Sequence, residues 1–162
     1  MSVDDSSVEL RAQGWRTLAA LYALIEDALE RALQRELDLS VSEYGVLDVL
    51  SRQSERLMRM NELSRAVVLS QSATTRLVGR LEQRGLLSRS ICVEDRRGIY
   101  TEVTIAGRAL LDQARPVHDG SLADALRQAE ELPELAPLVG ALATLRPVGA
   151  PRPELGATAA RS

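Results

Sequence analysis

LSQSATTRLVGRLEQRGLLSRSICVEDRRGIYTEV, the stretch from Leu69 to Val103, decides the fold. Ser70 is a good helix N-cap, because its hydroxyl accepts a hydrogen bond from one of the first free backbone N–H groups. Apolar residues then recur at spacings of three and four, which predicts one buried helical face. This face comprises Ala73, Leu77 and Leu81, with Thr74 and Val78 beside them. Gly85 follows where a left-handed residue ends a helix. The pattern therefore predicts a helix that begins after Ser70 and ends before Gly85.

The opposite face of this helix carries small, hydrogen-bonding or cationic side chains. They are Gln71, Ser72, Thr75, Arg76, Gly79 and Arg80. Such a face is slim enough to enter a DNA major groove and has donors for base edges and phosphates. The alternative is that the arginines are ordinary solvated charges. The candidate DNA contacts are Gln71, Ser72, Thr75, Arg76 and Arg80.

Two alternating runs follow, at 87–92 and 99–103, and a polar connector containing Gly98 joins them. Period-two alternation around such a connector predicts a β-hairpin. Its tip carries Asp95, Arg96 and Arg97. We expect the two arginines to contact a minor groove or phosphates, since narrow minor grooves concentrate negative potential. Asp95 is expected to orient a neighbouring arginine. A hairpin after a groove-sized helix is typical of a winged helix-turn-helix.

The residues before this stretch complete a DNA-binding lobe predicted to span 41–103. Ser40 and Glu43 form a capping box, S-x-x-E, which predicts a helix at 41–52. A polar connector at 51–59 precedes a short helix at 60–67, and Val68-Leu69-Ser70 turns into the predicted groove helix. Two short helices joined by such a turn form the helix-turn-helix unit.

Long helices are predicted on both sides of this lobe. We expect disorder at 1–9, a helix at 10–37, two helices within 104–145 and a flexible Pro-, Gly- and Ala-rich tail at 146–162. Pro116 is expected to kink the helix that Thr104 caps. The apolar stripe of 10–37 exceeds what a small lobe covers, which favours a homodimer. The expected fold class is mainly α with a small β-hairpin: a winged helix-turn-helix with N- and C-terminal dimerisation helices.

Charge and composition agree with this interpretation. The net charge of −3 conceals an asymmetry, because 51–108 carries 11 Arg against 6 acidic residues and the remainder is strongly acidic. A cationic centre suits a protein that presents one face to a polyanion. The sequence has no apolar run as long as a membrane span, and its polar, acidic N-terminus is unlike a signal peptide, so we expect a cytoplasmic protein. A single Cys and a single His exclude an intramolecular disulfide and a conventional structural zinc site, and no cofactor or metal is expected.

Taken together, these motifs resemble the MarR family of bacterial transcriptional regulators. The matching segments are LSQSATTRLV at 69–78, LEQRGLL at 81–87, EDRR at 94–97 and VTIAGR at 103–108. The resemblance covers roughly 10–145. It implies a triangular homodimer that places two lobes over successive major grooves of double-stranded DNA. It also implies repression, or sometimes activation, of nearby genes, relieved by a small, often aromatic effector or by oxidation. Within it, Asp95 and Arg97 match the D-x-R pair, whose arginine reaches the minor groove.

This sequence departs from the family pattern at two positions. Gly79 stands where the family usually has a polar or charged residue, which loosens the helix and removes a possible phosphate contact. Thr74 replaces the more usual apolar residue on the buried face, so we expect weaker packing there.

Other residues leave alternatives open. Trp15, Tyr22 and Tyr44 are candidates for an effector pocket between the first two helices and the fifth, or else plain core aromatics. Cys92 raises the alternative of a redox-responsive regulator, although reactive cysteines need a depressed pKa and access. An enzyme is not expected, because the sequence offers no arguable Ser/His/Asp set and no Gly-rich phosphate loop. A winged-helix module for protein–protein contact is a further alternative, but it would not need exposed Arg, Ser and Thr on the groove helix.

Overall fold

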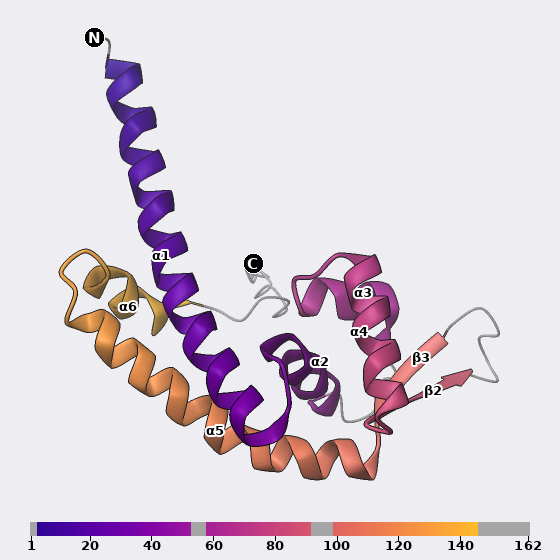
Figure 1. The fold of residues 1–162 in the computed structure, drawn as a ribbon. Helices are drawn as coiled ribbons and strands as arrows, with labels where there is room; N and C mark the ends of the chain where they lie inside the picture. Colours follow the sequence, from indigo (N-terminus) through magenta and orange to yellow (C-terminus); the bar gives the residue numbers. More distant parts are fainter. Residues whose placement is uncertain (1–2, 53–57, 92–98, 146–162) are drawn as a thin grey trace, which may run out of the picture.

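The structure, a computed structural model, describes residues 3–52, 58–91 and 99–145. Two long helices, α1 and α5, pack side by side, and a lobe of shorter elements lies at one end of the pair (Figure 1). The helices are α1 Val3–Leu37, α2 Val41–Ser51, α3 Met60–Ala66, α4 Gln71–Gln83, α5 Ile105–Glu130 and α6 Ala136–Leu142. The strands are β1 Met58–Arg59, β2 Leu87–Ile91 and β3 Ile99–Val103. The mainly helical fold with a small β-hairpin is confirmed.

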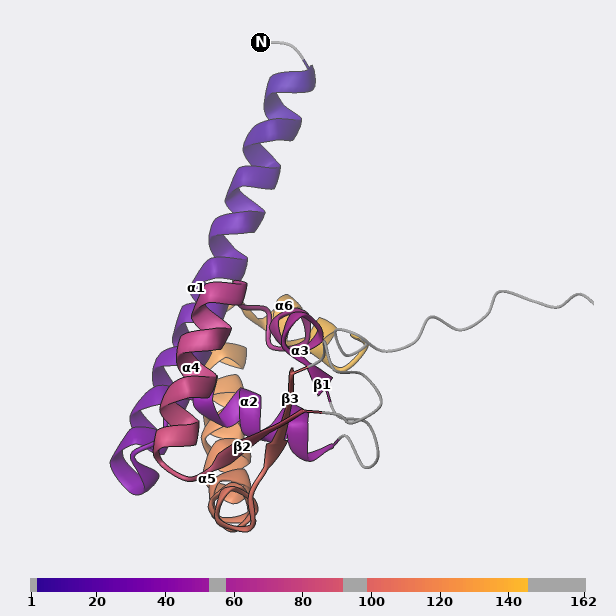
Figure 2. The ribbon, with the colours of Figure 1, turned by 90° about the vertical axis from the view of Figure 1, so that its right-hand side faces the viewer.

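Helix α1 begins earlier than the sequence pattern predicted. It starts at Val3, so the disorder predicted for 1–9 is wrong from that residue onward. The prediction relied on an apolar stripe, which packing requires but helix formation does not. Val8 and Leu10 are helical although both are exposed, and no glycine or proline precedes Gly14. The N-terminal half of α1 projects beyond the remaining elements (Figures 1 and 2).

The core of the lobe lies where α2, α3, α4 and the sheet meet the ends of α1 and α5. Its fully buried side chains include Leu33, Leu39, Leu47, Leu63 and Leu81. Helix α2 begins at the predicted capping box: the Ser40 hydroxyl accepts from Glu43 N–H at 3.1 Å, and the Glu43 carboxylate accepts from Ser40 N–H at 3.0 Å. The Glu30 carboxylate of α1 also accepts from Val41 N–H at 2.8 Å, which ties α1 to the start of α2.

The described residues form one three-stranded antiparallel sheet in the order β1-β3-β2. In the hairpin, Leu87 pairs with Val103 and Ile91 with Ile99. Strand β1, where Met58 pairs with Thr101, lies in the segment predicted to be a plain connector. Two residues are too few to show an alternating pattern, and their strand geometry depends on β3 as a partner.

Helix α5 starts immediately after β3 and leads away from the lobe. Thr104 caps it, since its hydroxyl accepts from Gly107 N–H at 3.0 Å and donates to the Gly85 carbonyl at 2.7 Å. The helix continues through Pro116 to Glu130 and packs along α1. Beyond it, α6 closes a second small core of Leu21, Ala129, Leu135 and Val139.

Candidate nucleic-acid interface

Helix α4 has one face held firmly in the lobe. Thr74, Leu77, Val78 and Leu81 are buried, and Ser70 caps the helix by accepting from Ala73 N–H at 3.2 Å. The Thr74 hydroxyl donates to the Ser70 carbonyl at 3.0 Å, so its burial leaves no unsatisfied donor. These contacts fix the rotation of α4 about its axis and hence the residues that it presents to solvent.

The exposed face of α4 brings together all five candidate contacts that the sequence placed there. Gln71, Ser72, Thr75, Arg76 and Arg80 are exposed. Ser72 and Arg76 lie nearly opposite the buried stripe, whereas Arg80 lies on the flank beside α2. The Thr75 hydroxyl donates to the Gln71 carbonyl at 2.9 Å, which leaves its lone pairs available as acceptors.

Ion pairs hold both flanks of α4. On the α2 side, Glu43 Oε2 lies 3.3 Å from Arg84 Nη1, and Glu43 Oε1 lies 3.7 Å from Arg80 Nε. On the hairpin side, Glu82 Oε1 lies 2.9 Å from Arg89 Nε of β2. Sequence reasoning identified Glu43 only as a capping residue. The sequence signal for the ion pairs of Glu43 was the i, i+4 spacing of Arg80 and Arg84, which places both arginines on one side of the helix.

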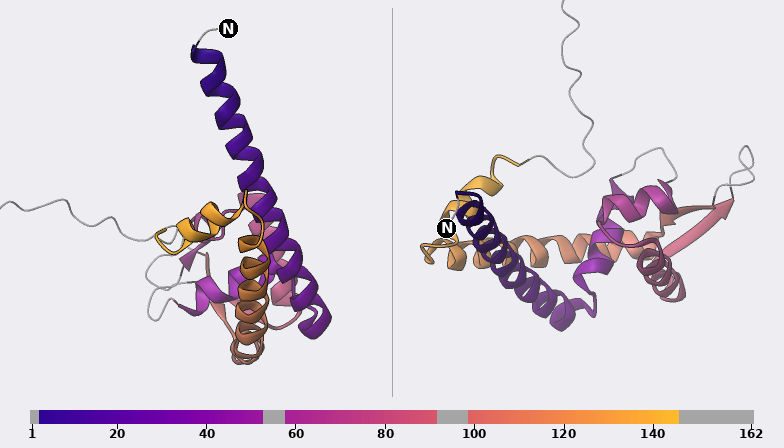
Figure 3. Two further views of the ribbon diagram at one scale, coloured as in Figure 1. Left: turned by 90° about the vertical axis from the view of Figure 1, so that its left-hand side faces the viewer. Right: turned by 90° about the horizontal axis from the view of Figure 1, so that it is seen from above.

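The predicted wing tip lies outside the described residues, and so do Asp95, Arg96, Arg97 and Cys92. Strands β2 and β3 lead to it and extend away from the helical body (Figure 3). The DNA contacts predicted for Arg96 and Arg97, the orienting role of Asp95 and the redox alternative at Cys92 therefore stay predictions.

A polar junction joins the lobe to α5. The ring of Tyr44 stacks on that of His118 with centroids 4.3 Å apart, and His118 Nδ1 lies 2.9 Å from Asp119 Oδ1. Beside them, Arg115 Nη2 lies 3.5 Å from Asp48 Oδ1 and donates to the Ser51 hydroxyl at 2.9 Å. Burial, with the charges of Asp48 and Asp119, raises the pKa of Tyr44 to about 12, so its phenol is neutral at physiological pH.

The three aromatic residues predicted to line an effector pocket do not come together within one chain. Tyr44 is buried in the core of the lobe, with 7% of its surface exposed. Trp15 and Tyr22 are 68% and 64% exposed, on the part of α1 remote from that core. Helical rise places Trp15 about 27 Å along α1 from Leu33, which packs in the same core as Tyr44.

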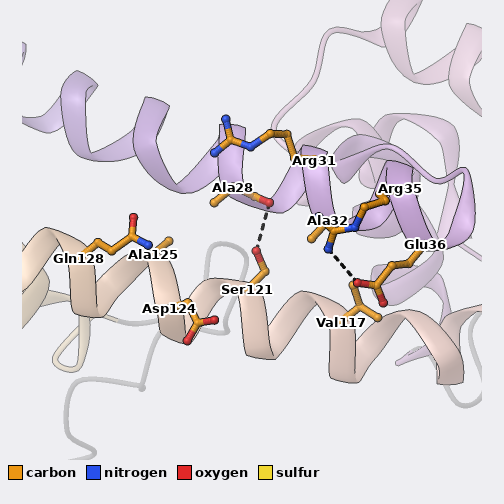
Figure 4. A pocket seen from close by; sticks show the side chains of 10 residues that line it. All are labelled: Ala28, Arg31, Ala32, Arg35, Glu36, Val117, Ser121, Asp124, Ala125 and Gln128. Atoms are coloured by element: carbon orange, nitrogen blue, oxygen red, sulfur yellow. Dashed lines mark hydrogen bonds and ion pairs between the residues drawn. The ribbon is translucent and has the colours of Figure 1, made fainter.

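A cleft of about 310 Å³ lies instead between the C-terminal half of α1 and the middle of α5 (Figure 4). Four of its lining residues are apolar and six are polar or charged. The lining residues are Ala28, Arg31, Ala32, Arg35, Glu36, Val117, Ser121, Asp124, Ala125 and Gln128. Ser121 bridges the two helices by donating to the Ala28 carbonyl at 3.1 Å. Its volume is at the lower end of the range for small-molecule sites.

Neither a metal centre nor a membrane span is found in the described part of the chain. No group of three or more His, Cys, Asp or Glu side chains there converges as a metal site. Within the same residues, no helix is both long and apolar enough to cross a bilayer.

A helix-turn-helix followed by a hairpin, set between long terminal helices, defines a winged-helix protein of the DNA-binding class. Comparison with known proteins specifies the family. The sequence model of the MarR family matches residues 37–98, which include α2, α3, α4 and β2. The winged unit of this chain thus matches the model of the MarR family, and the resemblance drawn from the sequence is confirmed.

Solved MarR-family structures extend the likeness beyond the matched segment. Sco3205, a MarR family regulator from Streptomyces coelicolor in complex with DNA, is 28% identical, with 88% of this chain and 93% of that chain covered and a TM-score of 0.65. AbsC from the same organism is 29% identical over 82% and 91% of the two chains, with a TM-score of 0.66. CouR from Rhodococcus jostii RHA1, bound to p-coumaroyl-CoA, is 28% identical over 78% and 84%, with a TM-score of 0.63.

Proposed function

We propose that this chain is a homodimeric repressor that acts in the cytoplasm, binds a pseudo-palindromic operator and is released by a small effector. The observation that carries the proposal is the exposed face of α4. Five hydrogen-bonding or cationic side chains share one face of a helix whose other face is fixed in the lobe. A helix of this kind after a helix-turn is the element that reads base edges in a major groove. The DNA complex of the similar Sco3205 supports the same use.

Exposed apolar side chains on the terminal helices support the homodimer. On α1, Val8, Trp15 and Tyr22 are exposed at seven-residue spacing, and Leu18 lies between the last two. Leu142 and Leu145, at the C-terminal end of the described chain, are exposed as well. A heptad seam of apolar residues is typical of helices that pack against a partner, and a large exposed apolar patch favours association. The second copy would then cover surface that one chain leaves in water.

The cleft between α1 and α5 is the described site that best suits a small effector. Its size suits a small molecule, although its lining is more polar than that of most small-molecule sites. Charged groups of both signs line it, because Arg31 and Arg35 lie there together with Glu36 and Asp124. The similar CouR, bound to p-coumaroyl-CoA, supports small-molecule control of this kind of fold.

Selection of DNA by the protein itself tests the proposal. The full chain is used to select duplexes from a randomised library, and fluorescence anisotropy then measures the affinity for a selected duplex. We expect two half-sites about one helical turn apart, roughly 34–36 Å, and an affinity that falls steeply with salt. Failure to enrich any sequence would contradict the proposal.

Arg76→Ala tests the reading face of α4. If Arg76 contacts a base edge, we expect a loss of about 1–3 kcal/mol on the selected duplex and relaxed preference at one position. A loss that is uniform across sequences would identify a phosphate contact instead. Arg127→Ala is the control, because it also removes one exposed arginine but lies near the far end of α5. An affinity unchanged by Arg76→Ala would remove this residue from the interface.

A further inference from the structure

A buried carboxylate lies against the helix that is proposed to enter the major groove. Only 7% of Glu43 is exposed, and its two oxygens contact arginines from successive turns of α4. Oε2 lies 3.3 Å from Arg84 Nη1 and also accepts from Ser40 N–H, so Glu43 is anchored in α2 while it contacts α4. Oε1 lies 3.7 Å from Arg80 Nε, and the Arg80 side chain is 59% exposed.

Capping alone does not require this ionic contact. A glutamine at the same position of a capping box also accepts from the N-cap N–H, and a charge at this site incurs a desolvation penalty. Glu43 lowers the summed charge of the Glu43–Arg80–Arg84 cluster from +2 to +1. Affinity for any duplex rises with each phosphate that an arginine neutralises, whatever the base sequence. The Glu43 carboxylate, which contacts Arg80 and Arg84, therefore opposes DNA binding that does not depend on sequence. It makes no contact with Ser72 or Arg76, so the outer face of α4 is unaffected.

We propose that Glu43 acts as an internal counter-ion that restrains Arg80 and thereby limits non-specific DNA binding. The inference rests on the proposed function, and it assigns Glu43 a role in specificity that acts through Arg80. Glu43 is a positioning residue, because the role requires no contact of its own with DNA. The proposal gives an unusual expectation, since removal of this buried carboxylate should strengthen binding to random DNA.

Glu43→Gln tests the role, because glutamine keeps the shape and the cap but removes the charge. Anisotropy titrations over a range of salt compare one selected duplex with one random duplex. We expect the affinity for the random duplex to rise roughly fivefold to tenfold at about 0.1 M salt, and the log–log salt slope to steepen by about one unit. The ratio of selected to random affinity should fall. A purely structural role predicts the opposite sign, because damage to the lobe weakens binding.

Two further variants separate this role from a general charge effect. Asp27→Asn gives the same change in net charge by removing the carboxylate of an exposed α1 ion pair with Arg31, and it should leave both affinities unchanged. When Arg80 is already replaced by glutamine, Glu43→Gln should not raise the affinity for the random duplex any further, because the effects of coupled residues are not additive. The proposal would be overturned if Asp27→Asn raised the affinity for the random duplex as much as Glu43→Gln does. It would also be overturned if Glu43→Gln gave its full increase in the Arg80→Gln protein.

Arg84→Gln approaches the same contact from the other side and does not depend on the fold tolerating Glu43→Gln. Without Arg84, the carboxylate is left to Arg80, so we expect weaker random binding and a shallower salt slope. A higher affinity of Arg84→Gln for the random duplex would overturn the inference. A folded Glu43→Gln protein whose affinity for the random duplex is unchanged or lower would overturn it as well. If the wild-type chain binds no duplex, the proposed function fails, and this inference fails with it. Wild-type binding with an unresponsive Glu43→Gln variant removes this inference alone.

Discussion

At the scale of single residues, Val68 in the helix-turn-helix turn combines two unfavourable features. Its φ is +56°, in the left-handed region that β-branched residues rarely adopt, and its side chain is 72% exposed. The turn requires this backbone geometry because Leu69 N–H bonds back to the Ser64 carbonyl at 3.0 Å. A conformation of this kind costs on the order of 1–3 kcal/mol.

Val68→Gly should therefore stabilise the fold. Glycine adopts positive φ at little steric cost, although it gains backbone freedom in the unfolded chain. We expect the free energy of unfolding to rise by about 1 kcal/mol, measured by urea denaturation. Val67→Gly is the matched control: its φ is −90° and its side chain packs against the core, so the same substitution one residue earlier should destabilise. Equal effects at both positions would contradict the role of strain.

At the scale of the element, the start of α5 depends on a close approach between helix and turn. A Cβ built at Gly107 would lie 2.7 Å from Val103 Cγ1 and even closer to the Leu86 carbonyl oxygen. Only glycine lets the first turn of α5 pack this tightly beneath the turn between α4 and β2. This close packing explains why a glycine stands at this position of the VTIAGR segment.

Gly107→Ala and Gly79→Ala form an informative pair on two helices. Gly107→Ala forces α5 away from Leu86, and we expect a loss of about 2 kcal/mol or more in the free energy of unfolding. A Cβ at Gly79 would meet nothing within 4 Å, so alanine there should add about 0.8–1 kcal/mol through helix propensity. Thermal and urea unfolding measure both variants. Tolerance of alanine at Gly107 would contradict the close approach.

At the scale of the whole molecule, α1 has two different environments along its length. Its C-terminal half packs against α5 and the lobe, with Leu29 and Leu33 buried. Its N-terminal half projects beyond the other elements, and Trp15, Leu18 and Tyr22 along this part of the helix and just after it are exposed. Removal of such surface from water contributes roughly 25 cal/mol per Å². Association through this half of α1 is the arrangement that we propose for the dimer.

Trp15→Glu should separate the two protomers without unfolding the lobe. A charge at the centre of an apolar interface, in place of a large aromatic anchor, costs about 2 kcal/mol or more. Sedimentation velocity should show a shift toward monomer, and affinity for the two-half-site duplex should fall with it. Gln13→Glu adds the same charge on the other side of the helix and should leave the dimer intact. A dimer that persists in Trp15→Glu would place the interface elsewhere.

Local patterns predicted the helices and the hairpin well, because their signals lie within one segment. Ser40, Ser70 and Thr104 cap the helices that follow them, and the two alternating runs contain the paired strands β2 and β3. The five candidate contacts on α4 could be found because the buried stripe sets which face is exposed. The pattern could not predict β1, whose strand geometry depends on β3. It also missed the contact of Glu43 with Arg80 and the separation of Tyr44 from Trp15, because both depend on tertiary packing.

The connection at Thr104 bears on the proposed release of DNA by an effector. A single residue separates the last hairpin strand from α5, and its hydroxyl bonds both to the new helix and to the Gly85 carbonyl after α4. A ligand that widened the gap between α1 and α5 would displace α5. The first turn of α5 is joined directly to β3 and, through the Thr104 hydroxyl, to the residue that ends the turn after α4. Displacement of α5 would then act on the hairpin and on α4 together, and these are the two parts that are proposed to contact DNA.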